Sequence, residues 1–128
     1  MMRYPLMTRS VGAKEQEMLD EIKGYKELIS AVINRAVLDS LAQPSATQKF
    51  APVAKDAMEF LLGDNIGLYL EFLDIDPKYF QEKLINNMFD DNQDVHFSPT
   101  KKRMFRINYK RYIQEKNRDL ILASTYIG

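Results

Sequence analysis

Residues 66–87 read IGLYLEFLDIDPKYFQEKLINN and contain two helical patterns with a sharp break between them. The break has the sequence DIDP, which is typical of a turn followed by a helix start. Asp76 can cap the second helix through its carboxylate, and Pro77 suits a first helical position, which needs no backbone N–H. The stretch therefore predicts a helix-turn-helix-like pair, with helices over residues 66–73 and 77–88.

Apolar side chains also form a stripe across residues 13–42, where their spacing alternates between four and three residues. The members of this stripe are Met18, Ile22, Tyr25, Ile29, Val32 and Ala36. The simpler interpretation is that the stripe packs into the core of its own chain. Because the spacing is heptad-like, the alternative is a short coiled coil, with a homodimer formed through residues 18–41.

The remaining segments complete an all-α fold of about five helices. Pro52 opens an apolar helix that Gly63 can end. Residues 101–122 show helical spacing after an acidic loop. Residues 103–110 also alternate apolar and polar side chains as a strand does, and we favour the helix.

Length and composition fit one folded domain. The chain has 128 residues, of which 45% are hydrophobic, enough to fill a core. We predict a single compact domain over residues 13–122, between a flexible arm of residues 1–12 and a frayed tail of residues 123–128. The chain has no cysteine, which fits a reducing cytoplasm, and no apolar run approaches the ~20 residues of a membrane span. We therefore expect a cytoplasmic protein without a membrane partner.

The formal net charge is zero, but the charged residues are unevenly distributed. Residues 1–100 hold ten Lys and Arg against sixteen Asp and Glu, whereas residues 101–118 hold eight against one. A local basic segment of this kind attracts polyanions even when the whole chain is neutral. Its predicted phosphate-binding residues are Lys101, Lys102, Arg103, Arg106, Lys110 and Arg111. The alternatives are a solvated face or a partner for the acidic loop at residues 90–94.

The second helix of the pair, residues 77–88, presents polar side chains outside its apolar stripe. A glutamine amide can pair bidentately with adenine, and a lysine can meet guanine or a phosphate. The predicted DNA-contacting residues are Lys78, Tyr79, Gln81 and Lys83. Glu82 makes this helix nearly neutral, and Asp74 stands where such turns commonly carry glycine. The alternative is therefore a helical pair that only packs in the core.

The sequence carries no catalytic or cofactor-binding signature. His96 is the only histidine, so a site with two histidine ligands cannot form within one chain. There is no P-loop and no dinucleotide-binding glycine motif. The acidic residues after Phe89 lack the glycine and the terminal glutamate of a calcium loop. We therefore expect no enzyme activity, no cofactor and no metal.

Two segments, AVINRAVLDSLAQ at residues 31–43 and AKDAMEFLLGDNIGLYLEFLDIDPKYFQEKL at residues 54–84, resemble small helical proteins of phages and prophages. The shared pattern is an aliphatic helix, a helix ending near an aromatic-leucine pair, and an LDIDP-like segment before an amphipathic helix. The resemblance implies a DNA-binding or transcription-regulatory protein in the cytoplasm of a bacterial host, and no enzyme. The alternatives are an interaction module or inhibitor that binds a host protein through its acidic surface, and a structural or packaging subunit.

Overall fold

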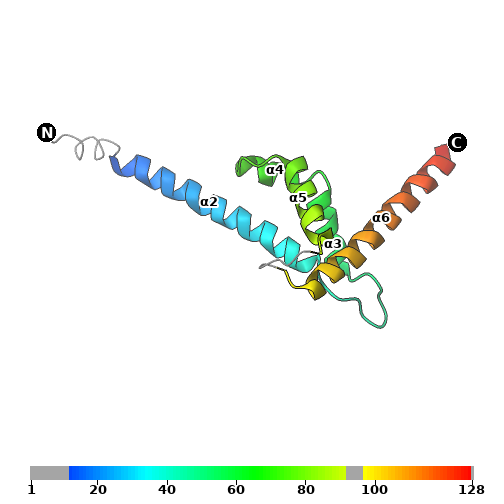
Figure 1. The fold of residues 1–128 in the computed structure, drawn as a ribbon. Helices are drawn as coiled ribbons and strands as arrows, with labels where there is room; N and C mark the ends of the chain where they lie inside the picture. The colour runs from blue at the N-terminus through cyan, green and yellow to red at the C-terminus, as the bar shows by residue number, and fades with distance from the viewer. Residues whose placement is uncertain (1–11, 92–96, 128) are drawn as a thin grey trace.

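The computed structural model describes residues 12–91 and 97–127 (Figure 1). This part of the chain is all-α, which confirms the predicted fold class, including the helix over residues 103–110. Its five helices are α2 (Gly12–Asp39), α3 (Pro52–Leu62), α4 (Ile66–Phe72), α5 (Pro77–Phe89) and α6 (Pro99–Ile127). Prolines set three of these starts, because a first helical position needs no backbone N–H.

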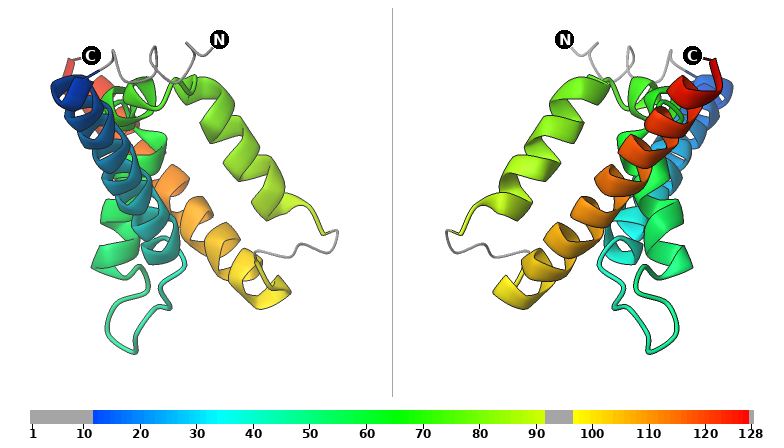
Figure 2. Two further views of the ribbon diagram at one scale, coloured as in Figure 1. Left: turned by 90° about the vertical axis from the view of Figure 1, so that its left-hand side faces the viewer. Right: turned by 90° about the vertical axis from the view of Figure 1, so that its right-hand side faces the viewer.

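Two long helices, α2 and α6, extend in different directions from the region where α3 contacts both (Figures 1 and 2). α5 packs against α6, and the short α4 contacts both α3 and α5. The N-terminal half of α2 and the C-terminal half of α6 reach beyond the other helices. The core therefore lies near the centre of the molecule, and the two long helices each leave it at one end.

The core joins α3, α4, α5 and α6 to the C-terminal part of α2. Its fully buried apolar residues are Met58, Leu61, Ile66, Leu70, Met88 and Phe105. α2 contributes Ile33, Ala36 and Val37. Asn108 of α6 is also fully buried, and its Nδ2 donates to the carbonyl oxygens of Ser40 (2.8 Å) and Ala42 (3.0 Å). These hydrogen bonds fasten the end of α2 to α6.

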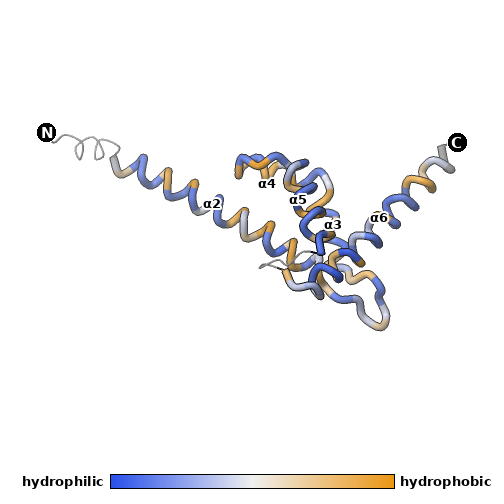
Figure 3. Tube along the Cα trace, viewed as in Figure 1, coloured by the Kyte–Doolittle hydropathy of each residue, from blue (hydrophilic) through white to orange (hydrophobic). Residues whose placement is uncertain are grey.

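The core uses only part of the apolar stripe of α2. Met18, Ile22 and Tyr25 are exposed, so the interpretation that the stripe packs into its own core is wrong for its first half. The reason is length, because α3, the main neighbour of α2, has 11 residues whereas α2 has 28. Figure 3 shows hydrophobic residues continuing along α2 beyond its contact with α3.

α2 keeps close to its predicted range of residues 13–42, whereas α6 exceeds its predicted end. α2 ends at Asp39 and is continuous through Gly24, although glycine is a weak helix former. α6 continues to Ile127, beyond the predicted end at Leu122. The tail that we predicted to fray from residue 123 is therefore helical as far as Ile127. Residues 1–11, most of the predicted arm, lie outside the described residues, as do residues 92–96 with His96.

Candidate functional site

The turn between α4 and α5 has a defined geometry. Asp74 adopts a left-handed conformation, with φ of 59°, which aspartate tolerates better than most residues. The backbone N–H of Ile75 donates to the carbonyl oxygen of Leu70 (2.9 Å), and the Ile75 side chain packs against the core. An aspartate thus occupies a left-handed position that suits glycine, and Ile75 anchors the turn.

α5 begins with the predicted cap. Asp76 Oδ2 accepts a hydrogen bond from the backbone N–H of Tyr79 (2.8 Å), and Pro77 occupies the start of the helix. The cap satisfies one of the N–H groups that a helix start leaves without an intrahelical acceptor. Together with the turn, this cap fixes the direction in which α5 leaves α4.

α5 has a buried face and an exposed face. Leu84 and Met88 are buried, and Phe80 packs against the same core. The opposite face is exposed and carries Lys78, Tyr79, Glu82, Lys83 and Asn86. Three of the four predicted DNA-contacting residues therefore lie together on one exposed face.

Gln81 is the exception, because its side chain is half-buried and bonded to α3. Its Nε2 donates to the carbonyl oxygens of Leu61 (3.1 Å) and Gly63 (3.3 Å) at the end of α3. The prediction that this amide faces outward is wrong. The two carbonyl groups come 20 and 18 residues earlier in the chain, so helical spacing within α5 could not reveal them.

Asn86 and Asn87 add exposed amides to α5. Asn86 lies one helical turn after Glu82 and Lys83, on the same exposed face. An asparagine amide can pair with adenine in the same way as a glutamine amide. These residues were not among the predicted contacts, although their helical spacing from Lys83 indicates them.

Two of the six predicted phosphate-binding cations are held by the end of α5. Lys102 is buried, and its Nζ donates to the carbonyl oxygen of Asp90 (3.0 Å). Arg106 donates from Nε to the carbonyl oxygen of Met88 (2.7 Å) and from Nη2 to Oδ1 of Asp91 (2.9 Å). These bonds join the start of α6 to the end of α5, and a phosphate would have to displace them.

The other four predicted cations divide into two groups. Lys101, Arg103 and Lys110 are exposed, whereas Arg111 is half-buried. Arg111 lines a hollow of about 250 Å³ between α6 and the loop before α3. Its Nη1 is buried and has no hydrogen-bond partner among the described residues. No residue of α5 lines this hollow, so it is separate from the exposed face of α5.

Further charged residues are paired across the interface between α3 and α6. Lys116 Nζ lies 2.8 Å from Glu59 Oε1, and Lys55 Nζ lies 3.0 Å from Glu115 Oε1. The hydrogen bond from Lys116, and then one from Tyr112, hold the pKa of Glu59 below its ordinary value. Burial, and then the hydrogen bond to Glu59, raise the pKa of Tyr112. This part of α6 is therefore engaged with α3.

Exposed cations lie near both ends of α5. Lys78 is in the first turn of α5. Lys101 and Arg103 lie at the start of α6. The hydrogen bond from Lys102 to Asp90 holds this start against the other end of α5. The 13 residues of α5 rise by about 20 Å. Positive charge therefore lies near each end of α5, with the exposed Asp76 at the first end and Asp90 and Asp91 at the second.

Among residues 12–91 and 97–127, no three acidic, histidine or cysteine side chains come close enough to hold a metal ion. No helix in this part of the chain is both long and apolar enough to cross a membrane. Comparisons with models of protein families, with curated proteins and with solved structures found no match. The exposed face of α5 is therefore a candidate site on its geometry alone, and the resemblance to phage proteins stays a prediction.

Proposed function

We propose that the protein binds DNA and that α5 enters the major groove. The observation that carries this proposal is the exposed polar face of α5, which follows a fixed turn and a capped helix start. The major groove is wide enough to admit an α-helix, and helix-turn-helix proteins place their second helix there. In this arrangement α4 and α5 form the pair and α3 supports it.

The side chains of that face match the chemistry of base edges and phosphates. Asn86 can pair with adenine through its amide, and Lys83 can donate to guanine. Lys78 and Tyr79, in the first turn of α5, can donate to phosphate oxygens. The backbone N–H groups at the start of α5 contribute less, because Asp76 already accepts from the N–H of Tyr79.

Most of the affinity in this proposal comes from phosphate contacts. The exposed cations assigned to this role are Lys78, Lys101, Arg103 and Lys110. Lys102 and Arg106 are left out of it, because they hold the start of α6 against the end of α5. With about four contacts, the logarithm of the binding constant falls against the logarithm of salt concentration with a slope of roughly −4.

The proposal extends to a transcription regulator of phage type, acting in the cytoplasm of a bacterial host. It is supported by the sequence resemblance over residues 31–85, a region that includes α3, α4 and most of α5. A regulator has to recognise one site among many. The test therefore has to separate specific from nonspecific binding.

Selection of bound duplexes from a random-sequence pool at low salt, followed by gel-shift titrations, tests the proposal. We expect one enriched site, and we expect Asn86→Ala to reduce the preference for it by about tenfold or more while nonspecific binding persists. Asn117→Ala is the matched control, because Asn117 is an exposed asparagine of α6. Absence of any salt-dependent DNA binding would contradict the proposal.

A structural or packaging subunit is the second candidate, and the exposed apolar stripe of α2 favours it. Such a subunit needs a ring or a larger assembly, so the mass of the purified protein in solution separates the two candidates. An inhibitor that binds a host protein through the acidic surface near residues 90–94 has less support. Asp91, which belongs to that surface, already pairs with Arg106 at 2.9 Å.

A further inference from the structure

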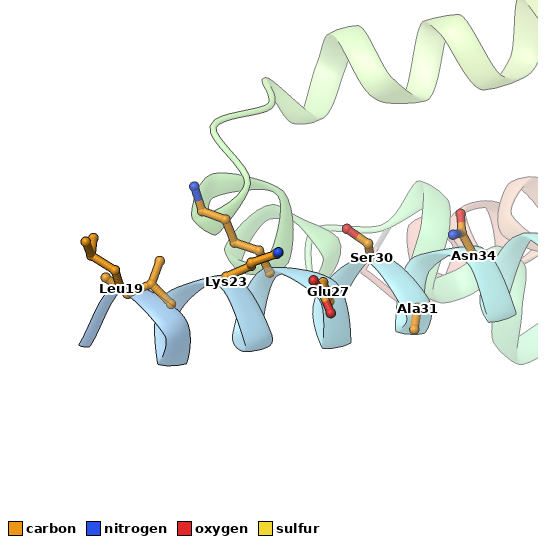
Figure 4. A pocket seen from close by; sticks show the side chains of 8 residues that line it. Leu19, Lys23, Glu27, Ser30, Ala31 and Asn34 are labelled. Carbon is orange, nitrogen blue, oxygen red and sulfur yellow. The ribbon is translucent and has the colours of Figure 1, made fainter. Parts of the chain in front are cut away.

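The first half of α2 carries a continuous exposed apolar surface. Met18, Leu19 and Tyr25 of this half, and Leu28 just beyond it, each expose more than half of their surface, and none of them belongs to the core. Figure 1 shows this half of α2 reaching past the other helices. The side chains that line the hollow in Figure 4 all come from α2 itself. Among the described residues, nothing covers this surface, and an exposed patch of this kind marks an interaction site.

The stripe has the heptad pattern of a two-stranded coiled coil. The two inward positions of each heptad, called a and d, are apolar: Met18, Ile22, Tyr25, Ile29 and Val32. Met18, Ile22, Tyr25 and Val32 are exposed, whereas Ile29 is half-buried and also packs against the core of its own chain. The outer side is mostly polar: Gln16, Glu17, Asp20, Lys23, Glu27, Ser30 and Asn34. Gly24 also lies on that outer side, so the helix loses no seam contact there.

We propose that this stripe pairs with the same stripe of a second copy of the chain, in a parallel two-stranded coiled coil over residues 18–32. The pairing does not depend on DNA binding, so either can fail without the other. Charge complementarity along the flanks of the stripe selects both the partner and the direction.

Glu21 and Lys26 flank the seam at the positions called g and e. In a parallel pair, position g of one helix lies beside position e of the partner's next heptad. Glu21 of each chain therefore meets Lys26 of the other chain, and symmetry makes two such pairs. Within the described residues, neither side chain forms an ion pair in its own chain.

Antiparallel pairs match these charges less well. The two antiparallel helices can be aligned in several registers. In one register, Glu21 and Lys26 each lie beside a leucine of the other chain and not beside an opposite charge. The next register sets Glu21 beside Arg35 of the other chain, but Arg35 already pairs with Asp39 of its own chain at 3.2 Å. This register also requires Ala36, which is buried in its own core, and brings the two copies of Lys26 together. A third register sets the two copies of Glu21 side by side. Like charges in these flanking positions are unfavourable, so the parallel pair is preferred.

Packing in the core orders α2 before this pairing. Ile33, Ala36 and Val37 hold the C-terminal part of α2 in the core, so the helix is formed before association. An isolated helix of about two heptads is marginal in water, and this anchoring removes much of the cost of ordering it. In a parallel pair the cores of the two chains, and hence the two copies of α5, lie at the same end of the dimer.

Sedimentation equilibrium of the full chain tests the pairing. We expect a dimer whose dissociation constant rises by about a hundredfold in Ile22→Gln, because each dimer loses two isoleucines from its seam. Glu27→Gln, on the outer side, is the matched control and should leave the dissociation constant unchanged. Circular dichroism should show normal helical content in Ile22→Gln, because Ile22 is exposed. A monomer at all concentrations, or a dimer that Ile22→Gln leaves intact, would overturn the proposal.

Single cysteines report the direction of pairing, because the chain has none of its own. In a parallel pair the two copies of residue 18 lie opposite each other, within the roughly 4–7 Å between Cα atoms that a disulfide spans. Met18→Cys should therefore oxidise to a covalent dimer, whereas Glu27→Cys should not. A Met18→Cys chain that crosslinks to an Ile29→Cys chain, but not to itself, would overturn the parallel arrangement.

Charge reversal gives a second test of the direction. Glu21→Lys should weaken the dimer, because it sets two lysines side by side on each flank of the parallel pair. Adding Lys26→Glu to the same chain should restore the dissociation constant, because both cross-chain pairs are then re-formed with reversed sign. A double variant no tighter than Glu21→Lys alone would overturn the assigned pairing.

Discussion

The side-chain amide of Gln81 in α5 donates to the carbonyl oxygen of Leu61 at the end of α3, at 3.1 Å. A second hydrogen bond from the same nitrogen reaches Gly63 at 3.3 Å. A side chain at Gly63 would clash, because its Cβ would lie 2.5 Å from the carbonyl oxygen of Glu59. The two hydrogen bonds from the Gln81 amide therefore join the close turn that ends α3 to α5.

Gln81→Leu tests how much these two hydrogen bonds contribute to stability. The leucine keeps a similar volume but leaves two partly buried carbonyl groups without their donor, so we expect the free energy of unfolding to fall by about 1–2 kcal/mol. Urea unfolding measures the change. Glu82→Leu is the control at an exposed neighbouring position and should change the free energy by less than about 0.5 kcal/mol. Equal stability of Gln81→Leu and the unmodified protein would show that these bonds do not hold α3 to α5.

The cap of α5 gives a second prediction. Asp76→Ala removes the acceptor for the N–H of Tyr79 and should lower the free energy of unfolding by about 1 kcal/mol. Asp76→Asn should stay close to the unmodified protein, because an amide oxygen also accepts this hydrogen bond. Thermal unfolding of both variants checks these two expectations. An asparagine variant as unstable as the alanine variant would assign the effect to charge instead of capping.

Gly24 gives a third prediction. A Cβ at this position would have no atom within 4 Å, so Gly24→Ala should stabilise the first half of α2 by about 1 kcal/mol. Hydrogen exchange of the surrounding amides should slow by about fivefold, since the helix opens less often. Gly12→Ala is the contrasting variant and should not stabilise, because Gly12 has a φ of 76°. Unchanged exchange around position 24 would contradict the prediction.

A fourth prediction concerns pH. The hydrogen bond from Lys116, and then that from Tyr112, lower the pKa of Glu59 from its ordinary value of 4.5. As the pH falls, the unfolded chain therefore binds this proton before the folded chain does. The stabilisation is fully present above about pH 4.5 and is lost as the pH falls through the lower pKa of the folded state.

Unfolding free energies measured between about pH 5 and pH 3 check this dependence. Glu59→Gln should flatten the loss of stability over that range, and Lys116→Met should flatten it in the same direction. The difference in unfolding free energy between each variant and the unmodified protein should change by less than about 1 kcal/mol over this range. Both side chains are about half exposed, so solvent screens the pair. A steeper loss of stability in Glu59→Gln would reverse the assigned sign.

The features that could be predicted from the sequence act within one or two helical turns. The cap by Asp76 and the start of α5 at Pro77 involve neighbouring residues, so the pattern of residue types identifies them. The bonds of Gln81, Lys102 and Arg106 could not be predicted in this way. Their acceptors are mainly backbone carbonyl groups of distant segments, and a carbonyl group carries no sequence signature.

The stripe of α2 illustrates the same limit. Its spacing predicts which side chains share one face of the helix, but it does not specify what covers that face. Only the fold reveals that α3 is too short to reach Met18 and Ile22, while it covers Ala36. The same stripe therefore serves as core at one end and remains exposed at the other.

The salt dependence of DNA binding tests most directly whether α5 meets DNA. Fluorescence anisotropy of a labelled mixed-sequence duplex, measured between about 50 and 200 mM salt, gives the slope of the binding constant against salt. The double variant Lys78→Ala, Lys101→Ala removes two of the assigned phosphate contacts and should reduce the magnitude of that slope by about 2. The control Lys14→Ala, Lys23→Ala removes the same charge from exposed positions of α2 and should keep the original slope. An unchanged slope in the double variant of Lys78 and Lys101, or no salt-dependent binding by the unmodified protein, would contradict the proposed function.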